Sequence, residues 1–298
     1  MKNKIKKNKH KRLLIIGSNF AFNHYRIIKR HYDFDIHIYS PNIKKKKSKF
    51  LNTKLINNLK DYNFFHTIVC CSNPSIQKKI ISKIIKKKII CKYIMLEKPI
   101  CNDLQLIRSF FKFCLKNKIH LQVNFTYNEL ITSGIISKNL LSKTFKKINF
   151  KLHFFHHYLM SPNNSWKNFI KDGGGVINYY IIHIIFLFVN IMSKIKIKQI
   201  HPIIKKNTFY GANIFLKSKN KNDIEIDLRI DKKKYLHEYN IYKKNSHIKI
   251  YSKQKNWYKE YIYENFTKSK KIRKKINESL DRSIKKNYEK LFEKKNKK

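Results

Sequence analysis

The segment Leu13–Phe22 (LLIIGSNFAF) sets the first expectation about the fold. Its first four residues, Leu13–Ile16, form an apolar run typical of a buried strand, and that strand ends at Gly17. A helical stretch follows from about Phe22 to His31. A strand that turns at a glycine into a helix is the arrangement in which a dinucleotide-binding fold brings a pyrophosphate to a helix N-terminus. The segment keeps one glycine of the usual three, so taken alone it leaves dinucleotide binding open.

The alternation of strand and helix continues outward from this segment to about residue 123. Strands are expected at 35–39, 67–71, 93–96 and 121–123, with helices at 76–85 and 103–116. Such alternation indicates a parallel α/β sheet. We therefore expect a Rossmann domain over residues 12–123. Residues 1–11 form a basic lead-in, and because no long apolar region follows it, a secretory signal is not expected.

The second half of the chain has a different pattern. Stretches of alternating polarity appear at 148–158, 195–200, 210–216, 223–230, 239–242 and 247–251. One long helix is expected around 174–192, and a Lys-rich helical stretch at about 276–292. These features predict an α+β domain over residues 124–298, built on a large, mostly antiparallel open sheet. We interpret the charge runs Lys44–Lys47 and Lys268–Lys274 as solvated surface.

The most apolar segment raises the question of a membrane span. Val176–Met192 is 17 residues long, and its clearly polar side chains are Asn178, His183 and Asn190. That length is at the short limit for crossing a bilayer. Three polar side chains and a preceding triple glycine favour a buried helix, so we expect no membrane span.

The charge of the chain is extreme, with 68 Lys+Arg against 18 Asp+Glu and a formal net charge of +50. Hydrophobic residues make up 42% of the chain, which excludes a disordered polycation. Only seven of the basic residues are Arg, although Arg is the residue that grips phosphates through its bidentate fork. We interpret the charge as compositional drift rather than nucleic-acid binding, and we expect no specific nucleic-acid partner.

Cysteine and histidine usage gives no sign of a disulfide framework or a metal site. The five cysteines lie in the first half, without the two-residue spacing of a metal or redox motif. Free thiols fit a reducing compartment, so a cytoplasmic location is expected. His153, His156 and His157 alternate with Phe154 and Phe155 as in a strand. Because no Asp or Glu stands near them, no metal is expected.

Glycine is scarce, with six in 298 residues. Those that occur mark places where the backbone does not tolerate a Cβ. Half of them stand together at Gly173–Gly175, just before the expected long helix. Such a cluster indicates close approach of the backbone to a ligand, and the alternative is a hinge.

Five sequence features carry a resemblance when they are read in order. They are residues 72–77 (SNPSIQ), residues 97–100 (EKPI), Trp166, residues 172–175 (DGGG) and His183. In this combination the chain resembles the Gfo/Idh/MocA family of NAD(P)-dependent oxidoreductases. The motifs cover about residues 12–192, and the remainder matches by element order only.

The resemblance implies a Rossmann domain followed by an open-sheet domain, with the active site in the cleft between them and a homo-oligomer formed through the open sheet. It implies NAD or NADP as cofactor. Residues implied in cofactor binding are Gly17, Ser18, Asn19, Phe20, Ser40, Ser72, Asn73, Pro74, Glu97 and Lys98. Residues implied at the substrate are Lys98, Trp166, Tyr179 and His183.

The chain departs from the family pattern at three places. Tyr179 stands four residues before His183, where an acidic residue is usual, and Phe186 stands three after it, where Asp is frequent. The second strand ends at Ser40 without the acidic residue that binds the adenine ribose. Because that acid would repel a 2′-phosphate and Lys44–Lys47 follow closely, NADP(H) fits as well as NAD(H).

The expected catalytic residues are Lys98, His183 and Tyr179. An ammonium at Lys98 would stabilise a developing alkoxide, and a histidine at 183 could take or give the proton near neutral pH. On a helix Tyr179 and His183 share a face, so the phenol would stand where the usual carboxylate does. The alternatives are a core histidine at 183, a surface lysine at 98 and a core tyrosine at 179.

We therefore expect an oxidoreductase that acts on a CH–OH group, transferring hydride between nicotinamide and a sugar or nucleotide sugar in surface-polysaccharide biosynthesis. The alternative is a catalytically silent, nucleotide-binding relative with a regulatory or scaffolding role. A basic nucleic-acid-binding protein is the third class, and no helix-turn-helix, zinc or RNA-binding motif supports it.

Overall fold

The chain forms two compact units in the computed structural model. The first comprises Met1–Asn124 and Ile284–Lys298, and the second comprises Phe125–Ser283. The structure describes residues 11–17, 20–40, 50, 53–56, 64–86, 88–141, 145–154, 180–192, 194–205, 208–218, 222–231, 235–253, 260–267, 270–277 and 279–293.

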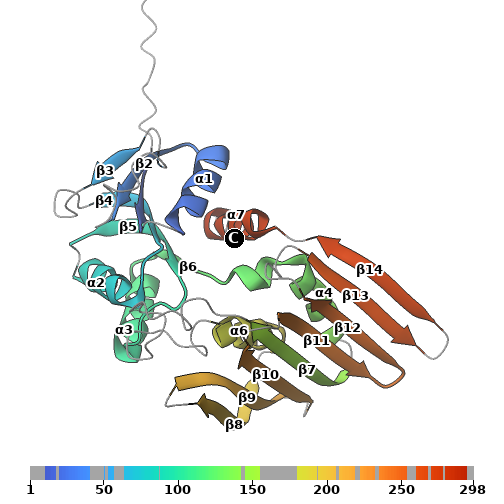
Figure 1. Ribbon diagram of the computed structural model, residues 1–298. Coiled ribbons are helices and arrows are strands. Elements are labelled where there is room, and N and C mark those ends of the chain that lie inside the picture. Colours follow the sequence, from blue (N-terminus) through green and yellow to red (C-terminus); the bar gives the residue numbers. More distant parts are fainter. Residues whose placement is uncertain are drawn as a thin grey trace, which may run out of the picture. The chain divides into compact units, whose positions relative to one another are not determined.

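The first unit is built on a six-stranded sheet with the order β3-β2-β1-β4-β5-β6 (Figure 1). All of its strand pairings are parallel, as the sequence predicted. The strands are β1 (Lys11–Ile16), β2 (Phe34–Tyr39), β3 (Lys54–Ile56), β4 (Phe64–Cys70), β5 (Ile90–Glu97) and β6 (His120–Asn124). The chain order reverses between the neighbours β1 and β4. Open α/β sheets bind ligands at the carboxyl ends of such strands.

Helices cover both faces of this sheet (Figure 1). They are α1 (Ala21–His31), α2 (Pro74–Ile85), α3 (Leu104–Lys116) and α7 (Leu280–Glu293). On the face of α2 and α3, buried strand residues such as Leu14, Ile68 and Ile94 share one core with the two helices. On the other face, the rings of Phe292 in α7 and Tyr93 in β5 are 5.4 Å apart. Strands buried on both faces explain the continuous apolar runs in the sequence.

Two helices begin at residues suited to a helix start. Asn73 accepts a hydrogen bond from the Ile76 amide at 2.9 Å, and Pro74 is the first residue of α2. Asp103 accepts one from the Leu106 amide at 2.9 Å and so caps α3. These caps satisfy backbone donors that the helix itself leaves unbonded.

The second unit is built on an eight-stranded sheet with the order β14-β13-β12-β11-β7-β10-β9-β8. The strands are β7 (Phe145–Phe154), β8 (Ile195–Lys205), β9 (Thr208–Ser218), β10 (Asp223–Ile230), β11 (Leu236–Lys243), β12 (Ser246–Ser252), β13 (Glu260–Thr267) and β14 (Lys271–Asn277). Only β7 and β10 pair in parallel, and the other pairings are antiparallel. The predicted large, mostly antiparallel sheet is therefore confirmed.

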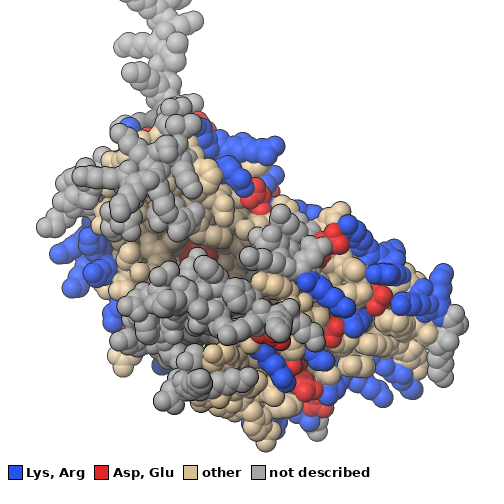
Figure 2. Space-filling view, viewed as in Figure 1, with Lys and Arg blue, Asp and Glu red and all other residues tan. Residues whose placement is uncertain are grey.

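One face of the large sheet packs against helices, and the opposite face carries charge. Helices α4 (Ile131–Leu140) and α6 (Ile182–Met192) share a core with inward-facing strand residues such as Phe150, and the 3₁₀-helix η3 (Thr126–Glu129) precedes α4. On the strands, Lys147 pairs with Glu225 at 2.9 Å, and Lys249 pairs with Glu238 at 2.9 Å. Lys and Arg side chains lie beside Asp and Glu over these strands (Figure 2). Part of the positive charge is thus balanced locally by ion pairs between strands.

Five of the described elements were not expected from the sequence, namely β3, η3, α4, β13 and β14. Lys271–Asn277 was interpreted as the end of a solvated charge run and the start of a helix, but it forms the edge strand β14. Its side chains are mostly exposed, and among them only Ile276 is buried. Charged, exposed side chains are typical of edge strands because they discourage pairing with other chains. Such a strand lacks the apolar alternation that would reveal it in the sequence.

The C-terminal helix also departs from the expected division of the chain. Residues 124–298 were all assigned to the second domain, whereas Ile284–Lys298 belong to the first compact unit. The reason is the apolar stripe Ile284, Tyr288 and Leu291, which is almost completely buried. Spacings of four and three residues place these side chains on one face of α7.

The apolar segment considered as a membrane span contains α6, which is 11 residues long. Among the helices that the structure describes, none has the length and apolarity needed to cross a membrane.

Candidate functional site

The candidate site lies in the first unit, at the edge where the parallel strands end. The register brings Ile16 of β1 opposite Cys70 of β4, and Glu97 of β5 opposite Asn124 of β6. The residues after β1, β4 and β5 therefore leave the sheet at the same edge. Ligands of doubly wound sheets bind there.

Gly17 is held in a tight turn directly after β1. Its φ is +134°, a conformation that side chains rarely permit. A Cβ at this position would lie 2.7 Å from the carbonyl oxygen of Cys71. The Gly17 amide donates to the Tyr39 carbonyl at 3.0 Å, and the Cys71 amide donates to Ile16 at 2.7 Å. The Cys71–Ile16 hydrogen bond thus joins the turn after β4 to the end of β1, and the Gly17–Tyr39 bond joins the turn after β1 to the end of β2.

Helix α1 begins at Ala21, and its N-cap residue Phe20 lies three residues after Gly17. Within the described part of the chain, no side chain caps its N-terminus. The first amides of a helix point outward and carry partial positive charge, so they bind phosphate well. A glycine turn followed by a helix without a side-chain cap fits a pyrophosphate. Ser18 and Asn19, also expected at the cofactor, lie outside the described residues.

The turn between β4 and α2 carries the next expected residues. The Ser72 hydroxyl donates to the Ile16 carbonyl at 3.2 Å, and Asn73 and Pro74 form the start of α2. Gln77, one turn further on, places Nε2 at 3.1 Å from the Ser72 carbonyl, 2.9 Å from the Glu97 carbonyl and 3.0 Å from the Pro99 carbonyl. Gln77 therefore joins the turn after β4 to the turn after β5.

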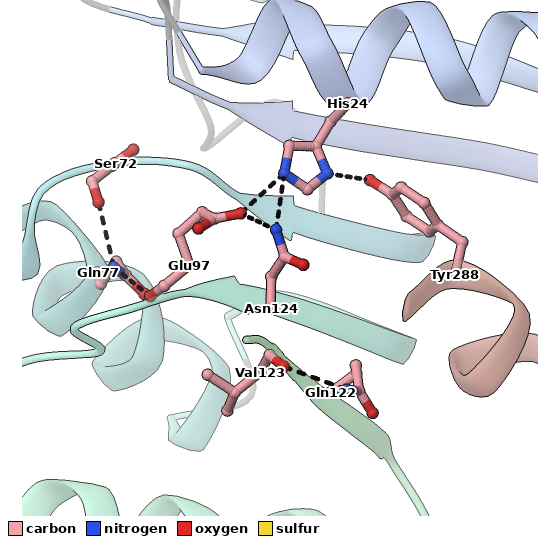
Figure 3. A network of polar contacts seen from close by, with 8 residues as sticks. All are labelled: His24, Ser72, Gln77, Glu97, Gln122, Val123, Asn124 and Tyr288. Atoms are coloured by element: carbon pink, nitrogen blue, oxygen red, sulfur yellow. Dashed lines mark hydrogen bonds and ion pairs between the residues drawn. The ribbon is translucent and has the colours of Figure 1, made fainter. Parts of the chain in front are cut away.

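Glu97 is the centre of a buried polar network (Figure 3). Its Oε1 lies 2.8 Å from His24 Nε2 and accepts a hydrogen bond from Asn124 Nδ2. The other nitrogen of the same ring, Nδ1, lies 2.6 Å from the hydroxyl of Tyr288. His24, Asn124 and Tyr288 are completely buried, while 12% of the Glu97 side chain is exposed. Among these four residues, Glu97 is the one whose side chain is partly exposed.

Burial sets the protonation of two groups in this network. It raises the pKa of the Tyr288 phenol well above its ordinary value, and the neighbouring Cys71 and Glu97 act in the same direction. It also raises the pKa of the Cys71 thiol well above its ordinary value, with Glu97 as the second cause. At neutral pH, therefore, Tyr288 keeps its hydroxyl hydrogen and Cys71 stays a thiol.

The ligand atoms of His24, Cys71 and Glu97 lie within 4.8 Å of one another, a spacing that a metal ion would accept. Metal ligation requires a thiolate and an imidazole nitrogen with a lone pair to give. Both ring nitrogens of His24 lie within hydrogen-bond distance of other groups, and the raised pKa of Cys71 opposes the thiolate. We therefore assign His24 and Glu97 to the hydrogen-bond network rather than to a metal site.

Lys98 and Ser40 complete the expected residues of the first unit. Lys98 follows Glu97 directly, is half-buried, and precedes a cis peptide bond to Pro99. Ser40 is buried and follows the end of β2. The ring of Phe20 lies edge-on to His24, with centroids 5.4 Å apart. In the first unit, the structure thus gathers Gly17, Phe20, Ser72 and Glu97 around one sheet edge.

His183 belongs to the second unit, on α6. It is 3% exposed, and its ring lies edge-on to Phe125 with centroids 5.9 Å apart. Phe186, one turn along, stacks on Phe125 at 3.8 Å. Trp166, Tyr179 and Gly173–Gly175 lie outside the described residues.

Sequence reasoning missed His24, Asn124 and Tyr288. Each stands on an element that was predicted, at least in part, but no local motif marks any of them. His24 shares the buried face of α1 with Tyr25, Ile27 and Ile28, where a polar residue was the available signal. A histidine and a tyrosine on otherwise apolar helix faces are worth examining as partners for a carboxylate at a strand end.

The two units together define the class of fold: a doubly wound dinucleotide-type sheet joined to an α+β unit on a large antiparallel sheet. This is the two-domain fold of the Gfo/Idh/MocA oxidoreductases. No model of a protein family matches the sequence, and no curated protein matches it.

KijD10 from Actinomadura kijaniata, a 3-ketoreductase solved with NADP and TDP-benzene, has a TM-score of 0.77 and 10% identity, over 94% of this chain and 88% of its own. The dehydrogenase MviM from Clostridium difficile has a TM-score of 0.74 and 15% identity, and the match covers 95% of this chain and 89% of MviM. The WlbA dehydrogenase from Chromobacterium violaceum was solved with NADH and UDP-GlcNAcA. It has a TM-score of 0.68 and 12% identity, and the match covers 83% of this chain and 75% of WlbA. At these identities the likeness establishes the fold.

Proposed function

We propose that this protein is an NAD(P)-dependent oxidoreductase that acts on a CH–OH group of a sugar or nucleotide sugar. The observation that carries the proposal is the convergence of the Gly17 turn, the Ser72–Pro74 turn and the Glu97 carboxylate at one edge of a parallel sheet. Two similar structures support the substrate class, because they were solved with TDP-benzene and with UDP-GlcNAcA. A role in surface-polysaccharide biosynthesis is part of the same proposal.

The residues of the first unit fit a dinucleotide. The Gly17 turn and the N-terminus of α1, with Ser18, Asn19 and Phe20, would hold the pyrophosphate. Ser72, Asn73 and Pro74 would line the ribose and nicotinamide, and Glu97 would accept hydrogen bonds from the nicotinamide ribose. Ser40 would border the adenine ribose. Because Ser40 carries no negative charge to repel a 2′-phosphate, both NAD(H) and NADP(H) are retained.

The bound nicotinamide would supply the hydride acceptor or donor, and the protein would handle the proton and the charge. Lys98 would polarise the reacting oxygen and stabilise negative charge on it. His183 would exchange the proton of that oxygen. Tyr179 and Trp166 would contact the substrate, with the Tyr179 phenol in place of the usual carboxylate.

A second candidate is a silent relative that binds the nucleotide for regulation or scaffolding. It is favoured by one specific observation: Phe186 stacks on Phe125 at 3.8 Å where related enzymes often carry Asp. Such a protein would keep the dinucleotide site of the first unit and lack turnover.

Further parts of the proposal concern assembly and location. The charged face of the large sheet would join copies of the chain into a homo-oligomer. A cytoplasmic location agrees with the cysteines, all five of which are free. We also propose that the protein has no specific nucleic-acid partner. Its Lys residues are widely scattered, and some form ion pairs with acids on neighbouring strands (Figure 2).

The experiment is stopped-flow reduction of bound NAD or NADP with a panel of sugars and nucleotide sugars. We expect Lys98→Ala and His183→Ala each to lower turnover by about two to four powers of ten, since each removes a group that acts in the transition state. Lys98→Arg is the matched control for charge and should recover little of the loss, because a planar fork replaces a compact ammonium.

If the two residues act as a unit, the double variant will lose far less than the product of the two single losses. Full activity of His183→Ala would contradict its acid/base role. Binding of cofactor by the wild type without hydride transfer to any substrate of the panel would favour the silent relative.

A further inference from the structure

Two elements meet at one oxygen of Glu97, and a third contacts it through His24. His24 comes from α1 and Asn124 from the end of β6, and both meet Oε1. Tyr288 comes from α7 and reaches the far side of the His24 ring (Figure 3). Both hydrogen bonds that described residues make to this carboxylate go to Oε1.

The chemistry of the end groups fixes the direction of the chain of hydrogen bonds. A carboxylate only accepts, so His24 Nε2 carries the hydrogen that Glu97 Oε1 receives. The raised pKa of Tyr288 keeps its hydroxyl hydrogen in place. With the ring hydrogen on Nε2, Nδ1 accepts, so the Tyr288 hydroxyl donates to it and favours the tautomer that points N–H at Glu97.

Helix α7 is held at this place by a second polar contact and by its rings. Asn287, one residue before Tyr288, accepts a hydrogen bond from Gln122 Nε2 at 3.0 Å. The Tyr288 ring lies 6.0 Å from both Tyr32 and Phe292. Asn287 and Tyr288 are almost completely buried, so the hydroxyl of Tyr288 has a fixed direction.

We propose that Tyr288 and His24 are positioning residues for Glu97: they hold Oε1 inward, so that Oε2 faces the hydroxyl groups of a dinucleotide ribose. This rests on the proposed function, since it assumes that a dinucleotide binds at this edge. Orientation of a carboxylate in advance improves affinity because less freedom is lost on binding. The C-terminal helix would then contribute to cofactor binding without touching the cofactor.

A purely structural role for Tyr288 would have a different consequence. Loss of its hydroxyl would then lower stability and leave the affinity of the folded protein for dinucleotide unchanged. Affinity and ring tautomer are therefore the two informative measurements.

The matched pair of variants is Tyr288→Phe and Tyr93→Phe. Both tyrosines are buried in the first unit and both rings contact Phe292, but only the Tyr288 hydroxyl contacts His24. Fluorescence titration with NADH and NADPH should show Tyr288→Phe weaker than wild type by about three- to tenfold, the worth of one buried hydrogen bond. Tyr93→Phe should bind like wild type.

A second pair of variants separates the contacts that the two ring nitrogens of His24 make. An asparagine amide takes the place of Nδ1, and a glutamine amide takes the place of Nε2. His24→Gln keeps a donor to Glu97 and should bind dinucleotide better than His24→Asn, which keeps only the contact to Tyr288. This pair tests the inference even if Tyr288→Phe fails to fold.

Nitrogen-15 NMR of the histidine rings in the protein without cofactor reads the tautomer directly. We expect the hydrogen of His24 on Nε2 in wild type and in Tyr93→Phe, with a changed Nδ1 signal in Tyr288→Phe. Equal affinity of Tyr288→Phe and Tyr93→Phe, or of the two His24 variants, would overturn the positioning role while wild type still binds. Failure of wild type to bind either dinucleotide would instead overturn the proposed function, and the inference with it.

Discussion

Each unit buries a histidine against the hydroxyl of a buried tyrosine, but in different surroundings. In the first unit His24 lies between Tyr288 and the Glu97 carboxylate, at the edge where parallel strands end. In the second unit His237 of β11 contacts the Tyr261 hydroxyl and the rings of Phe150 and Tyr239. The same pair of residue types therefore contacts a partly exposed acid in the first unit and is enclosed among aromatic side chains in the second.

The difference teaches that burial alone does not mark a functional group. Burial lowers the pKa of His237 to about 3, as expected for a ring surrounded by aromatic side chains. What distinguishes His24 is its connection to a partly exposed acid at a sheet edge. We therefore expect changes near His237 to alter stability, and changes near His24 to alter dinucleotide affinity.

The largest expected effect is a loss of stability at low pH, caused by His237 in the second unit. His237 stays neutral in the folded protein down to about pH 3, whereas in the unfolded chain it takes up a proton near pH 6.5. Its contribution to stability is thus fully present above pH 6.5 and is lost as the pH falls. From this group the free energy of unfolding should decrease by about 1.4 kcal/mol per pH unit below 6.5.

Chemical unfolding of wild type and His237→Phe between pH 6.5 and 4.5 measures this slope. The variant should show a shallower dependence on pH by the same amount. Identical slopes would mean that His237 is charged in the folded protein or is not buried.

Removal of the Tyr261 hydroxyl should have a smaller effect, at constant pH. Tyr261→Phe leaves His237 without that hydrogen bond, at a cost of about 1–3 kcal/mol in the free energy of unfolding. Its affinity for NADH and NADPH should equal that of wild type, unlike that of Tyr288→Phe. A weakened affinity in Tyr261→Phe would erase the distinction between the two histidines.

Much of the fold was predictable, because most of its elements leave a local signal in the sequence. Strands β1, β4 and β5 contain continuous apolar runs, and Gly17, Pro74 and Pro99 mark the turns that follow them. The edge strand β14 was missed because its charged, exposed side chains leave no alternation. The place of α7 was missed because a buried stripe in a Lys-rich helix does not say which unit buries it.

The candidate site was predictable only where local motifs mark it. Glu97 stands before Lys98-Pro99, and Gly17 ends an apolar run, so both could be identified. His24, Asn124 and Tyr288 come from positions far apart in the chain, and their meeting at Glu97 depends on tertiary structure. Such a network becomes visible only when the strand order and the packing of α7 are known.

The central claim is that the carboxyl edge of the parallel sheet binds a dinucleotide through the turn at Gly17. The direct test is a fluorescence titration of wild type and Gly17→Ala with NADH and NADPH. A Cβ at residue 17 would meet the Cys71 carbonyl at 2.7 Å in a conformation that strains any side chain. The account predicts that wild type binds at least one of the two and that Gly17→Ala binds it more than about tenfold more weakly, above about 1.4 kcal/mol. Equal affinities of the folded wild type and variant, or no binding by wild type, would contradict it.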